Sequence, residues 1–402
     1  MSTQPYLHSP LATRGQALDP RDAETLSIAG ADRVAQTLAM RENAQATPLH
    51  ALPALAGELG LGALYVKDEG FRLGLGSFKA LGGAYALMVL VREEASRQLG
   101  REVAISEVMS EEVRKVAAGM VFACATDGNH GRSVAQGAQL MGARAVIFVH
   151  AGVSQARADA IAAFGAEIIR VEGNYDASVT EASRVAETEG WTVLSDTSWP
   201  GYEYIPSLVM QGYTAMVREA LAEMPQPPTH IFLQAGVGGF AAAVAGHMSV
   251  VLGENRPHIT VVDPARAACL YESAKIGHPV EVPETDSTVM AMLECFEPSM
   301  VAFRVLERVA DGFMTVDEAS AWDVMNRLAR PKGDDPAIVA GESGGAGLAA
   351  AIEVLNQPDL AAKIGLGPDA RVLVFNTEGA TDPALFQEMT GLSPEAVLGQ
   401  AA

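Results

Sequence analysis

The sequence predicts an α/β protein in which largely parallel sheets are covered by helices. Short runs of β-branched and other apolar residues alternate along the chain with alanine-rich segments of helical length. Hydrophobic residues make up 49% of the 402 residues and charged residues 19%, so apolar material for a substantial core is available. Because the two kinds of segment alternate, we expect βαβ crossovers in two open α/β subdomains.

The expected strands are nearly continuous in apolar residues, as parallel strands covered on both faces are. They are predicted at residues 64–66, 120–125, 145–149, 167–171, 191–194, 230–233, 259–262 and 371–375. Helices are predicted at residues 80–91, 131–141, 154–164, 175–189, 205–222 and 240–253. The charged stretch at 93–115 has the character of an insertion and is also expected to be helical.

Two subdomains fit the length of the chain. Residues 1–87 and 206–402 are predicted to form a larger domain, into which a smaller α/β domain at 88–205 is inserted. In open α/β sheets, ligands bind at the carboxyl ends of the strands. We therefore look for functional residues where the predicted strands end.

The net charge of −21 argues against nucleic acid or an anionic membrane as a partner and favours a small-molecule substrate. Residues 1–10 contain no basic patch followed by an apolar run, so no secretory signal is predicted. Three cysteines do not make a disulfide framework, which favours the cytoplasm and reduced thiols. Whether Cys269 and Cys295 pair stays open.

One lysine, Lys79, stands in an apolar setting, in the stretch Gly-Ser-Phe-Lys-Ala-Leu-Gly-Gly at residues 76–83. One interpretation is a lysine at a helix start whose ammonium group reaches water. The other is a partly desolvated amine that acts as a nucleophile toward a carbonyl carbon. The motifs at the strand ends decide between the two.

A cluster of polar residues follows the strand predicted at 120–125, namely Thr126, Asp127, Asn129 and His130. A capping turn at the next helix would need one polar residue rather than four, although such a turn remains the alternative. The cluster is therefore a candidate ligand site.

A glycine loop, Gly236, Val237, Gly238 and Gly239, follows the strand predicted at 230–233 and opens a helix. Successive backbone N–H groups in such a loop can converge on a phosphate. The loop is neither a Walker A motif nor a complete GxGxxG fingerprint, and close helix packing is the alternative explanation for its glycines.

Two more loops place a polar residue after a strand. Thr377 follows the strand at 371–375, where an ordinary turn is the alternative, and Asp196 follows the strand at 191–194, where a helix cap is the alternative. The polar run at 67–69 is expected to form only a surface or subdomain ion pair.

A phosphate-binding loop together with an amine nucleophile suggests a phosphorylated aldehyde that is held as an imine. Pyridoxal 5'-phosphate is such a cofactor, and it acts as an electron sink for carbanions. This interpretation uses both Lys79 and the glycine loop. No metal site is predicted.

Three motifs, at residues 77–79, 128–131 and 236–239, are similar in order and spacing to those of the fold-type II (tryptophan synthase β-like) pyridoxal-phosphate enzymes. The match extends over nearly the whole chain. Longer motifs resemble the diaminopropionate ammonia-lyase family. They lie at residues 66–69, 126–131, 196–202, 210–213, 234–238, 341–344 and 376–379.

The resemblance implies roles for the residues toward the cofactor. Lys79 is expected to form the imine, and Asn129 to hydrogen-bond the phenolic oxygen. Gly236, Val237, Gly238 and Gly239 are expected to cradle the phosphate. Thr377 is expected to lie near the pyridine nitrogen, which a neutral hydroxyl leaves unprotonated.

The resemblance also implies roles toward the substrate. Ser77, Thr126 and the backbone up to His130 are expected to receive its carboxylate. Asp127 departs from the small neutral residue that dehydratases of this fold carry; its carboxylate suits an ammonium leaving group and can act as a base opposite the lysine. Asp196 is expected to hold or protonate the leaving amine.

The sequence therefore predicts α,β-elimination of D- or L-2,3-diaminopropionate, or of both, to pyruvate and ammonia. The resemblance also implies a homodimer. A threonine or serine dehydratase of the same fold is the alternative enzyme. A non-catalytic nucleotide-binding regulator is the alternative from another class, but it has no use for Lys79.

Overall fold

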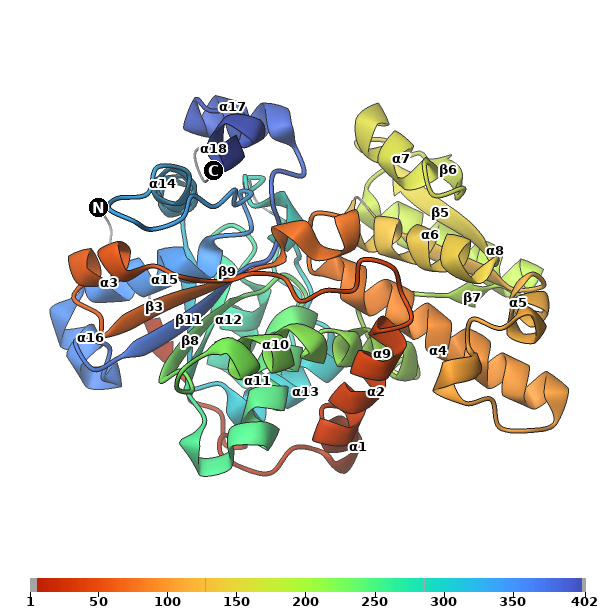
Figure 1. Ribbon diagram of the computed structural model, residues 1–402, viewed down its shortest axis with the longest axis horizontal. Helices are drawn as coiled ribbons and strands as arrows, with labels where there is room; N and C mark the ends of the chain where they lie inside the picture. Colours follow the sequence, from red (N-terminus) through yellow and green to blue (C-terminus); the bar gives the residue numbers. More distant parts are fainter. Residues whose placement is uncertain (1–5, 127, 285, 400–402) are drawn as a thin grey trace. The chain divides into compact units, whose positions relative to one another are not determined.

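The computed structural model describes residues 6–126, 128–284 and 286–399. The chain divides into two compact units (Figure 1). Unit 1 comprises residues 1–28, 46–78 and 216–402, and unit 2 comprises residues 29–45 and 79–215. Each unit is built around its own sheet, as expected for an α/β chain with two subdomains.

Unit 1 contains a seven-stranded sheet in the order β1-β10-β9-β8-β11-β3-β2. The strands are β1 (Tyr6–His8), β2 (Leu49–Ala51), β3 (Ala63–Asp68), β8 (His230–Gln234), β9 (His258–Pro264), β10 (Gly312–Val316) and β11 (Arg371–Asn376). The five inner strands are parallel, and the edge strands β1 and β2 are antiparallel to their neighbours. Every residue of β8 and β10 is buried, which explains why both strands are mostly apolar.

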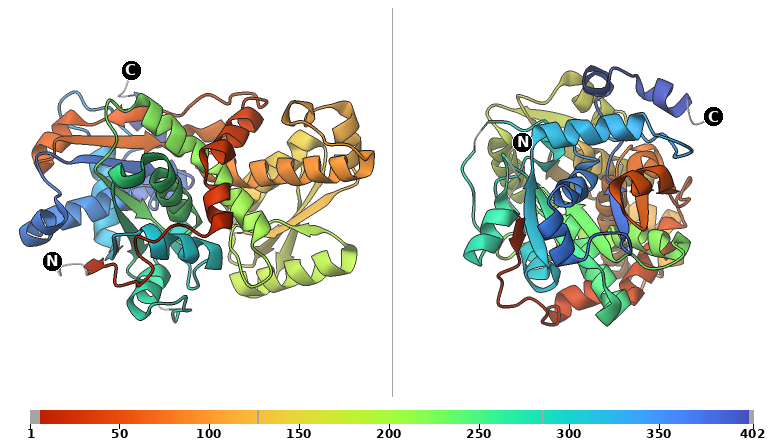
Figure 2. Two further views of the ribbon diagram at one scale, coloured as in Figure 1. Left: turned by 90° about the horizontal axis from the view of Figure 1, so that it is seen from below. Right: turned by 90° about the vertical axis from the view of Figure 1, so that its left-hand side faces the viewer.

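Most helices of unit 1 pack on this sheet or on the helices that cover it, and α17 packs on α14 (Figures 1 and 2). They are α1 (Pro20–Thr25), α3 (Pro53–Leu59), α11 (Gly239–Leu252), α12 (Cys269–Ile276), α13 (Met300–Val309), α14 (Glu318–Ala329), α15 (Ala346–Leu355), α16 (Pro358–Ile364), α17 (Pro383–Thr390) and α18 (Pro394–Gly399). Helix α15 packs along the central strands, and α11 packs on β8 with α13 beside it.

Unit 2 contains a four-stranded parallel sheet in the order β6-β5-β4-β7. Its strands are β4 (Val121–Ala125), β5 (Arg144–His150), β6 (Glu167–Val171) and β7 (Thr192–Val193). Its helices are α2 (Ile28–Leu38), α4 (Lys79–Leu99), α5 (Glu111–Ala117), α6 (Asn129–Met141), α7 (Gln155–Ala162), α8 (Tyr175–Glu189) and α9 (Tyr204–Gly212), and α10 (Thr214–Glu223) continues into unit 1.

Unit 2 extends further on both sides than the predicted domain at 88–205. Helix α4 explains the difference at the first junction, because its first turns pack against other helices of unit 2. The N–H of Ala84 donates to Ser133 Oγ at 3.1 Å, and the Tyr85 hydroxyl donates to Gln211 Oε1 at 2.6 Å. Arg41 donates to the Ala80 carbonyl at 3.2 Å, which attaches residues 29–45 to the same helix.

The predicted helix at 205–222 is divided into α9 and α10. The Thr214 hydroxyl donates to the Gln211 carbonyl at 2.7 Å and competes with the regular helical hydrogen bonds there. Strands β1, β2 and β10 were not predicted, and the other eight described strands lie where the sequence indicates, within a few residues at their ends.

The polar run at 67–69 lies in the interior, so its prediction as a surface pair was wrong. The side chains of Lys67, Glu69 and Arg72 are fully buried. Lys67 Nζ lies 2.7 Å from Glu219 Oε2, and Arg72 donates to Glu69 at 2.8 Å and to Glu219 at 2.6 Å. We call these four residues the buried ion-pair cluster; its two cations balance its two carboxylates.

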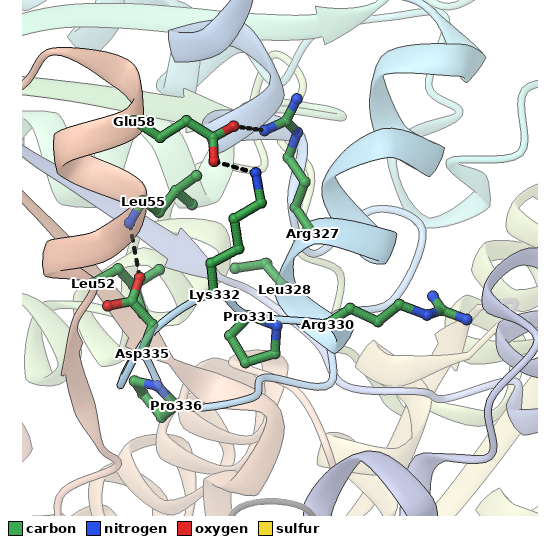
Figure 3. Close-up of a pocket in the computed structure, with 10 residues that line it drawn as sticks. All are labelled: Leu52, Leu55, Glu58, Arg327, Leu328, Arg330, Pro331, Lys332, Asp335 and Pro336. Carbon is green, nitrogen blue, oxygen red and sulfur yellow. Dashed lines mark hydrogen bonds and ion pairs between the residues drawn. The ribbon is translucent and has the colours of Figure 1, made fainter.

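A small pocket lies between α3 and α14 (Figure 3). Glu58 at its rim accepts hydrogen bonds from Arg327 at 2.8 Å and from Lys332 at 2.6 Å. Asp335 accepts from the N–H groups of Ala54 and Leu55, both at 2.9 Å. These polar groups satisfy one another, so the pocket belongs to the packing of α3 against α14.

None of the helices in the described segments has the length and apolar character needed to cross a membrane. The same segments contain no cluster of His, Cys, Asp and Glu side chains that could hold a metal ion.

Candidate active site

In unit 1, the segment that precedes Lys79 is paired with the chain that follows β11. Phe78 N donates to the Thr377 carbonyl at 3.0 Å, and Gly379 N donates to the Gly76 carbonyl at 3.0 Å. Between these bonds, Ser77 and Glu378 form an antiparallel bridge. The end of β11 therefore fixes the backbone that leads into Lys79.

Ser77 and Thr377 are both buried in this pairing, with 1% and 3% of their surface exposed. The Ser77 hydroxyl has no hydrogen-bond partner in the described part of the chain. The Thr377 hydroxyl lies 3.0 Å from Gln234 Nε2, at the end of the neighbouring strand β8. Two predicted site residues are thus close together in unit 1, and each presents a hydroxyl group that can take a further partner.

The glycine loop leads from β8 into α11 as predicted. Gly238 is the N-cap of α11, and its φ of 98° lies in the left-handed region that favours glycine. A Cβ on Gly236 would lie 2.9 Å from Cys295 Sγ, so a side chain there would collide with the neighbouring loop. Both glycines are therefore required by the shape of the loop.

The backbone N–H groups of the glycine loop are uncommitted. No side chain caps α11, and within the described residues no protein acceptor is recorded for the N–H groups of residues 236–239. The N-terminus of a helix also carries a partial positive charge. This end of α11 can therefore hold a phosphate through its backbone.

In unit 2, Lys79 and Asp196 form an ion pair. Lys79 is the first residue of α4, and its Nζ donates to Asp196 Oδ2. Their side chains are 22% and 16% exposed, so the pair is partly open to solvent. Burial disfavours the charged carboxylate, but Lys79 and then His130 outweigh this effect and hold the pKa of Asp196 well below its usual range.

The loop that carries Asp196 is closed by an aromatic pair. The Tyr202 hydroxyl donates to the Val193 carbonyl at 2.8 Å and accepts from Ser195 N at 3.0 Å. The Trp199 ring stacks on the Tyr202 ring with centroids 4.2 Å apart. The Tyr202 hydroxyl therefore holds the backbone at Val193 and Ser195, just before Asp196.

The polar cluster after β4 forms the entry to α6. Thr126 Oγ1 accepts from Gly128 N at 3.1 Å and from Gly131 N at 3.2 Å, so this hydroxyl shapes the turn. Asn129 is the first residue of α6 and is 8% exposed. His130 Nε2 lies 2.9 Å from the Leu194 carbonyl, and its Nδ1 lies 3.9 Å from Asp196 Oδ2.

The structure thus groups the predicted residues by unit. Lys79, His130 and Asp196 lie together in unit 2, beside the turn made by Thr126. Ser77 and Thr377 lie together in unit 1, and the glycine loop follows the strand next to β11. Asp127 lies outside the described residues.

Sequence reasoning assigned no role to two residues that hold the predicted ones. Gln234 contacts Thr377, and Tyr202 anchors the Asp196 loop. The signal for Gln234 was a polar residue at the end of an otherwise apolar strand, and the signal for Tyr202 was an aromatic residue in a glycine- and proline-containing loop. Cys269 and Cys295 are both present as thiols.

Comparisons with known proteins assign this arrangement to a family. Residues 40–378 match the model of the pyridoxal-phosphate-dependent enzymes. Diaminopropionate ammonia-lyase of Salmonella typhimurium is 40% identical over 357 residues, which cover 86% of this chain and 88% of that protein. The biosynthetic L-threonine dehydratase of the same organism is 28% identical and is matched over 57% of its length.

Solved structures agree with the sequence comparison. The crystal structure of holo diaminopropionate ammonia-lyase from Escherichia coli is similar with a TM-score of 0.86 and 36% identity, and the match covers 98% of both chains. The same enzyme in complex with an aminoacrylate–PLP azomethine reaction intermediate matches equally well. The chain therefore belongs to the pyridoxal-phosphate-dependent enzymes and, among them, to the diaminopropionate ammonia-lyase family.

Proposed function

We propose that this protein eliminates ammonia from 2,3-diaminopropionate and yields pyruvate and a second ammonia. The observation that carries the proposal is the partly open ion pair of Lys79 and Asp196, in a chain of the ammonia-lyase family. One substrate and one water give one pyruvate and two ammonia molecules, so the reaction needs no external oxidant or reductant.

The cofactor is pyridoxal 5'-phosphate, which withdraws electrons from the substrate's α-carbon when it is bound. We assign its phosphate to the uncommitted N–H groups of Gly236, Val237, Gly238 and Gly239, which fit an anion. We assign its ring nitrogen to Thr377 and its phenolic oxygen to Asn129. Lys79 would hold its aldehyde carbon through the side-chain nitrogen until the substrate's amine takes that place.

Proton removal from the substrate's α-carbon is the task we assign to Lys79 and Asp127. The freed Lys79 amine takes the proton from one face, and the Asp127 carboxylate takes it from the other. Two bases on opposite faces allow both enantiomers to react. Ser77, Thr126 and the backbone up to His130 hold the substrate's carboxylate; the buried Ser77 hydroxyl, without a partner in the described residues, supports this assignment.

Asp196 is the group that we assign to the leaving amine. Its carboxylate binds one ammonium group in the structure, that of Lys79. While the freed Lys79 amine is neutral and poised to take the α-proton, Asp196 would be able to receive the β-ammonium group of the substrate instead. The C–N bond then breaks, the amine departs as ammonia, and the released aminoacrylate hydrolyses to pyruvate.

A threonine or serine dehydratase is the second candidate, because the same lysine chemistry expels hydroxide. Asp196 argues against it: a carboxylate that already binds an ammonium suits a cationic leaving group better than a neutral hydroxyl. The more distant match to threonine dehydratase points the same way.

A substrate panel tests the proposal. The purified protein is loaded with pyridoxal phosphate and given D- and L-2,3-diaminopropionate, L-threonine and L-serine, while keto-acid release is followed. We expect pyruvate to form fastest from diaminopropionate. Faster turnover of threonine or serine would establish a dehydratase, and a protein that stays colourless with pyridoxal phosphate would overturn both enzyme assignments.

The opposite-face base has its own test. Asp127→Asn removes one proton acceptor and leaves Lys79 in place, so we expect the rate with one enantiomer of diaminopropionate to fall far more than the rate with the other. Equal and small losses for both enantiomers would show that Asp127 is not a base. Asp159→Asn, an exposed aspartate on α7, is the matched control.

We also propose that the enzyme acts in the cytoplasm as a homodimer. The charge of −21, the reduced thiols and the family support this assignment. Light scattering of the purified holoenzyme measures the mass directly, and a monomer mass would contradict the dimer.

A further inference from the structure

Gln234 is a buried polar residue without an assigned role. It ends β8, only 1% of its surface is exposed, and the other residues of the strand except His230 are apolar. An uncharged amide in such a place costs free energy unless it is hydrogen-bonded. Its contacts therefore indicate what it does.

The amide nitrogen of Gln234 meets three oxygen atoms. It lies 2.8 Å from the Gly344 carbonyl, 2.9 Å from the Phe375 carbonyl and 3.0 Å from Thr377 Oγ1. The two carbonyls can only accept, so only the NH2 group of the amide can face them. The orientation of the amide is thereby fixed by the backbone of two loops.

This orientation determines the role of the Thr377 hydroxyl. The NH2 group has two hydrogens for these three oxygens, and an amide nitrogen does not accept hydrogen bonds, so Thr377 Oγ1 can only accept a shared hydrogen in its contact with Gln234. The hydroxyl hydrogen must then point elsewhere, and no acceptor for it is recorded among the described residues. The backbone holds Thr377 in place, because its N–H donates to Gly344 O at 3.3 Å and its carbonyl accepts from Phe78 N at 3.0 Å.

We propose that Gln234 is a positioning residue that commits the Thr377 hydroxyl to donate its hydrogen to the ring nitrogen of the cofactor. The inference rests on the proposed place of that nitrogen beside Thr377. A nitrogen that accepts a hydrogen bond keeps its lone pair and stays unprotonated. A ring with an unprotonated nitrogen withdraws less negative charge from the α-carbon than a protonated ring does. The charge at the α-carbon is then used to expel the β-amine rather than being stored in the ring.

The test is nitrogen NMR of the holoenzyme loaded with pyridoxal phosphate that is isotope-labelled at the ring nitrogen. Protonated and unprotonated ring nitrogens give well-separated signals, and a donated hydrogen bond moves the unprotonated signal part of the way toward the protonated one. We expect the unprotonated, hydrogen-bonded signal in the unaltered enzyme. A protonated signal there would overturn the proposal without any variant.

Two variants extend the test. Gln234→Met keeps the length of the side chain but removes the donor, which frees the Thr377 hydroxyl to rotate, so we expect the signal to move away from the protonated position. Gln234→Glu offers an acceptor to Thr377 and reverses its hydroxyl, so we expect the signal to move toward the protonated position. An unchanged signal in either loaded variant would show that Gln234 does not direct Thr377.

Controls separate this inference from the proposed function. Gln211→Met removes another buried amide, which accepts from Tyr85 at 2.6 Å, and should leave the nitrogen signal unchanged. Thr377→Val should give an unprotonated signal without a hydrogen bond. If the unaltered enzyme releases pyruvate from diaminopropionate but its ring nitrogen is protonated, only the role of Gln234 fails; if it does not bind the cofactor, the proposed function fails.

Discussion

Two lysine–carboxylate pairs, one in each unit, are made of the same chemical groups but have different surroundings. Lys67 in unit 1 is fully buried; it binds Glu219 at 2.7 Å and the Thr47 carbonyl at 2.5 Å. Lys79 in unit 2 is 22% exposed and binds Asp196, which is 16% exposed. An enclosed ammonium cannot reach a substrate, whereas a partly open one can.

The two carboxylates also differ in the cations that they meet. Glu219 is 15% exposed, but both of its cations, Lys67 and Arg72, are fully buried and fixed on it. Asp196 has Lys79 at hydrogen-bond distance and His130 at 3.9 Å. The comparison teaches that burial and the number of fixed partners, rather than residue type, separate a structural ion pair from one suited to chemistry.

The largest effect is expected from Lys79→Met. The variant loses the only amine that we assign to the cofactor's aldehyde, so turnover and the visible absorbance of the bound cofactor should both disappear. Thermal unfolding without the cofactor should shift to a lower temperature, because Lys79 also lowers the pKa of the mostly buried Asp196 carboxylate, and this shift is measured separately from turnover. Retention of full activity would remove Lys79 from the site.

Asp196→Asn is expected to have the next largest effect. The amide keeps the shape but cannot bind an ammonium group or protonate a leaving amine as a carboxyl group does, so kcat with diaminopropionate should fall about 10²–10⁴-fold. β-Chloroalanine, whose chloride leaves without a proton, should lose far less. Equal losses with both substrates would mean that Asp196 acts on another step.

Lys67→Met tests the structural member of the comparison. It leaves Glu69 and Glu219 with one cation fewer in the interior, and breaking such a buried pair costs about 3–5 kcal/mol of unfolding free energy. Denaturant unfolding measures this loss. Lys115→Met, in an exposed pair with Glu111, is the control and should cost less than about 1 kcal/mol.

The sequence was sufficient to predict the α/β fold class, most of the strands and the cofactor. Alternating apolar and alanine-rich segments predicted the sheets, and Lys79 with the glycine loop predicted the cofactor, which the family match confirms. These features are local: each depends on neighbours along the chain. The bounds of unit 2 depend instead on how α4 packs, which involves residues far apart in sequence.

Contacts between distant residues explain what the sequence could not predict. Lys67 and Glu219 are each polar residues in their own segments, and only the fold brings them together in the interior. In the same way, Gln234 and Thr377 meet because β8 and β11 are neighbours in the sheet. Neither pairing leaves a signal in composition or spacing.

Mild acid should lower the stability of unit 1 around His258 before it affects unit 2 around Asp196. Burial lowers the pKa of His258 in unit 1 from its usual 6.5 to about 4. Because the folded-state pKa lies below the unfolded one, the unfolded chain binds more protons between these pH values, and stability falls as the pH drops from 6.5 to 4. The depressed pKa of Asp196 keeps its contribution until the pH falls below the ordinary aspartate range.

Hydrogen exchange at several pH values measures this difference unit by unit. Amides around β9 should lose protection between pH 6.5 and 4, and His258→Gln, which cannot titrate, should remove much of the effect. Loss of protection first around Asp196 in unit 2 would contradict the assignment.

The smallest effect is expected from Tyr202→Phe, which alters the support of Asp196 without touching its carboxylate. The variant keeps the ring that stacks on Trp199 but removes the hydroxyl between Val193 O and Ser195 N. Because the two lost hydrogen bonds are worth about 0.5–1.5 kcal/mol each, a misplaced loop should lower kcat by no more than about a hundredfold. Asp196 acts on the leaving amine in our assignment, so β-chloroalanine should restore most of the lost rate. If the rate falls equally with both substrates, Tyr202 supports folding of the loop in general; if β-chloroalanine rescues it, the hydroxyl serves to place Asp196.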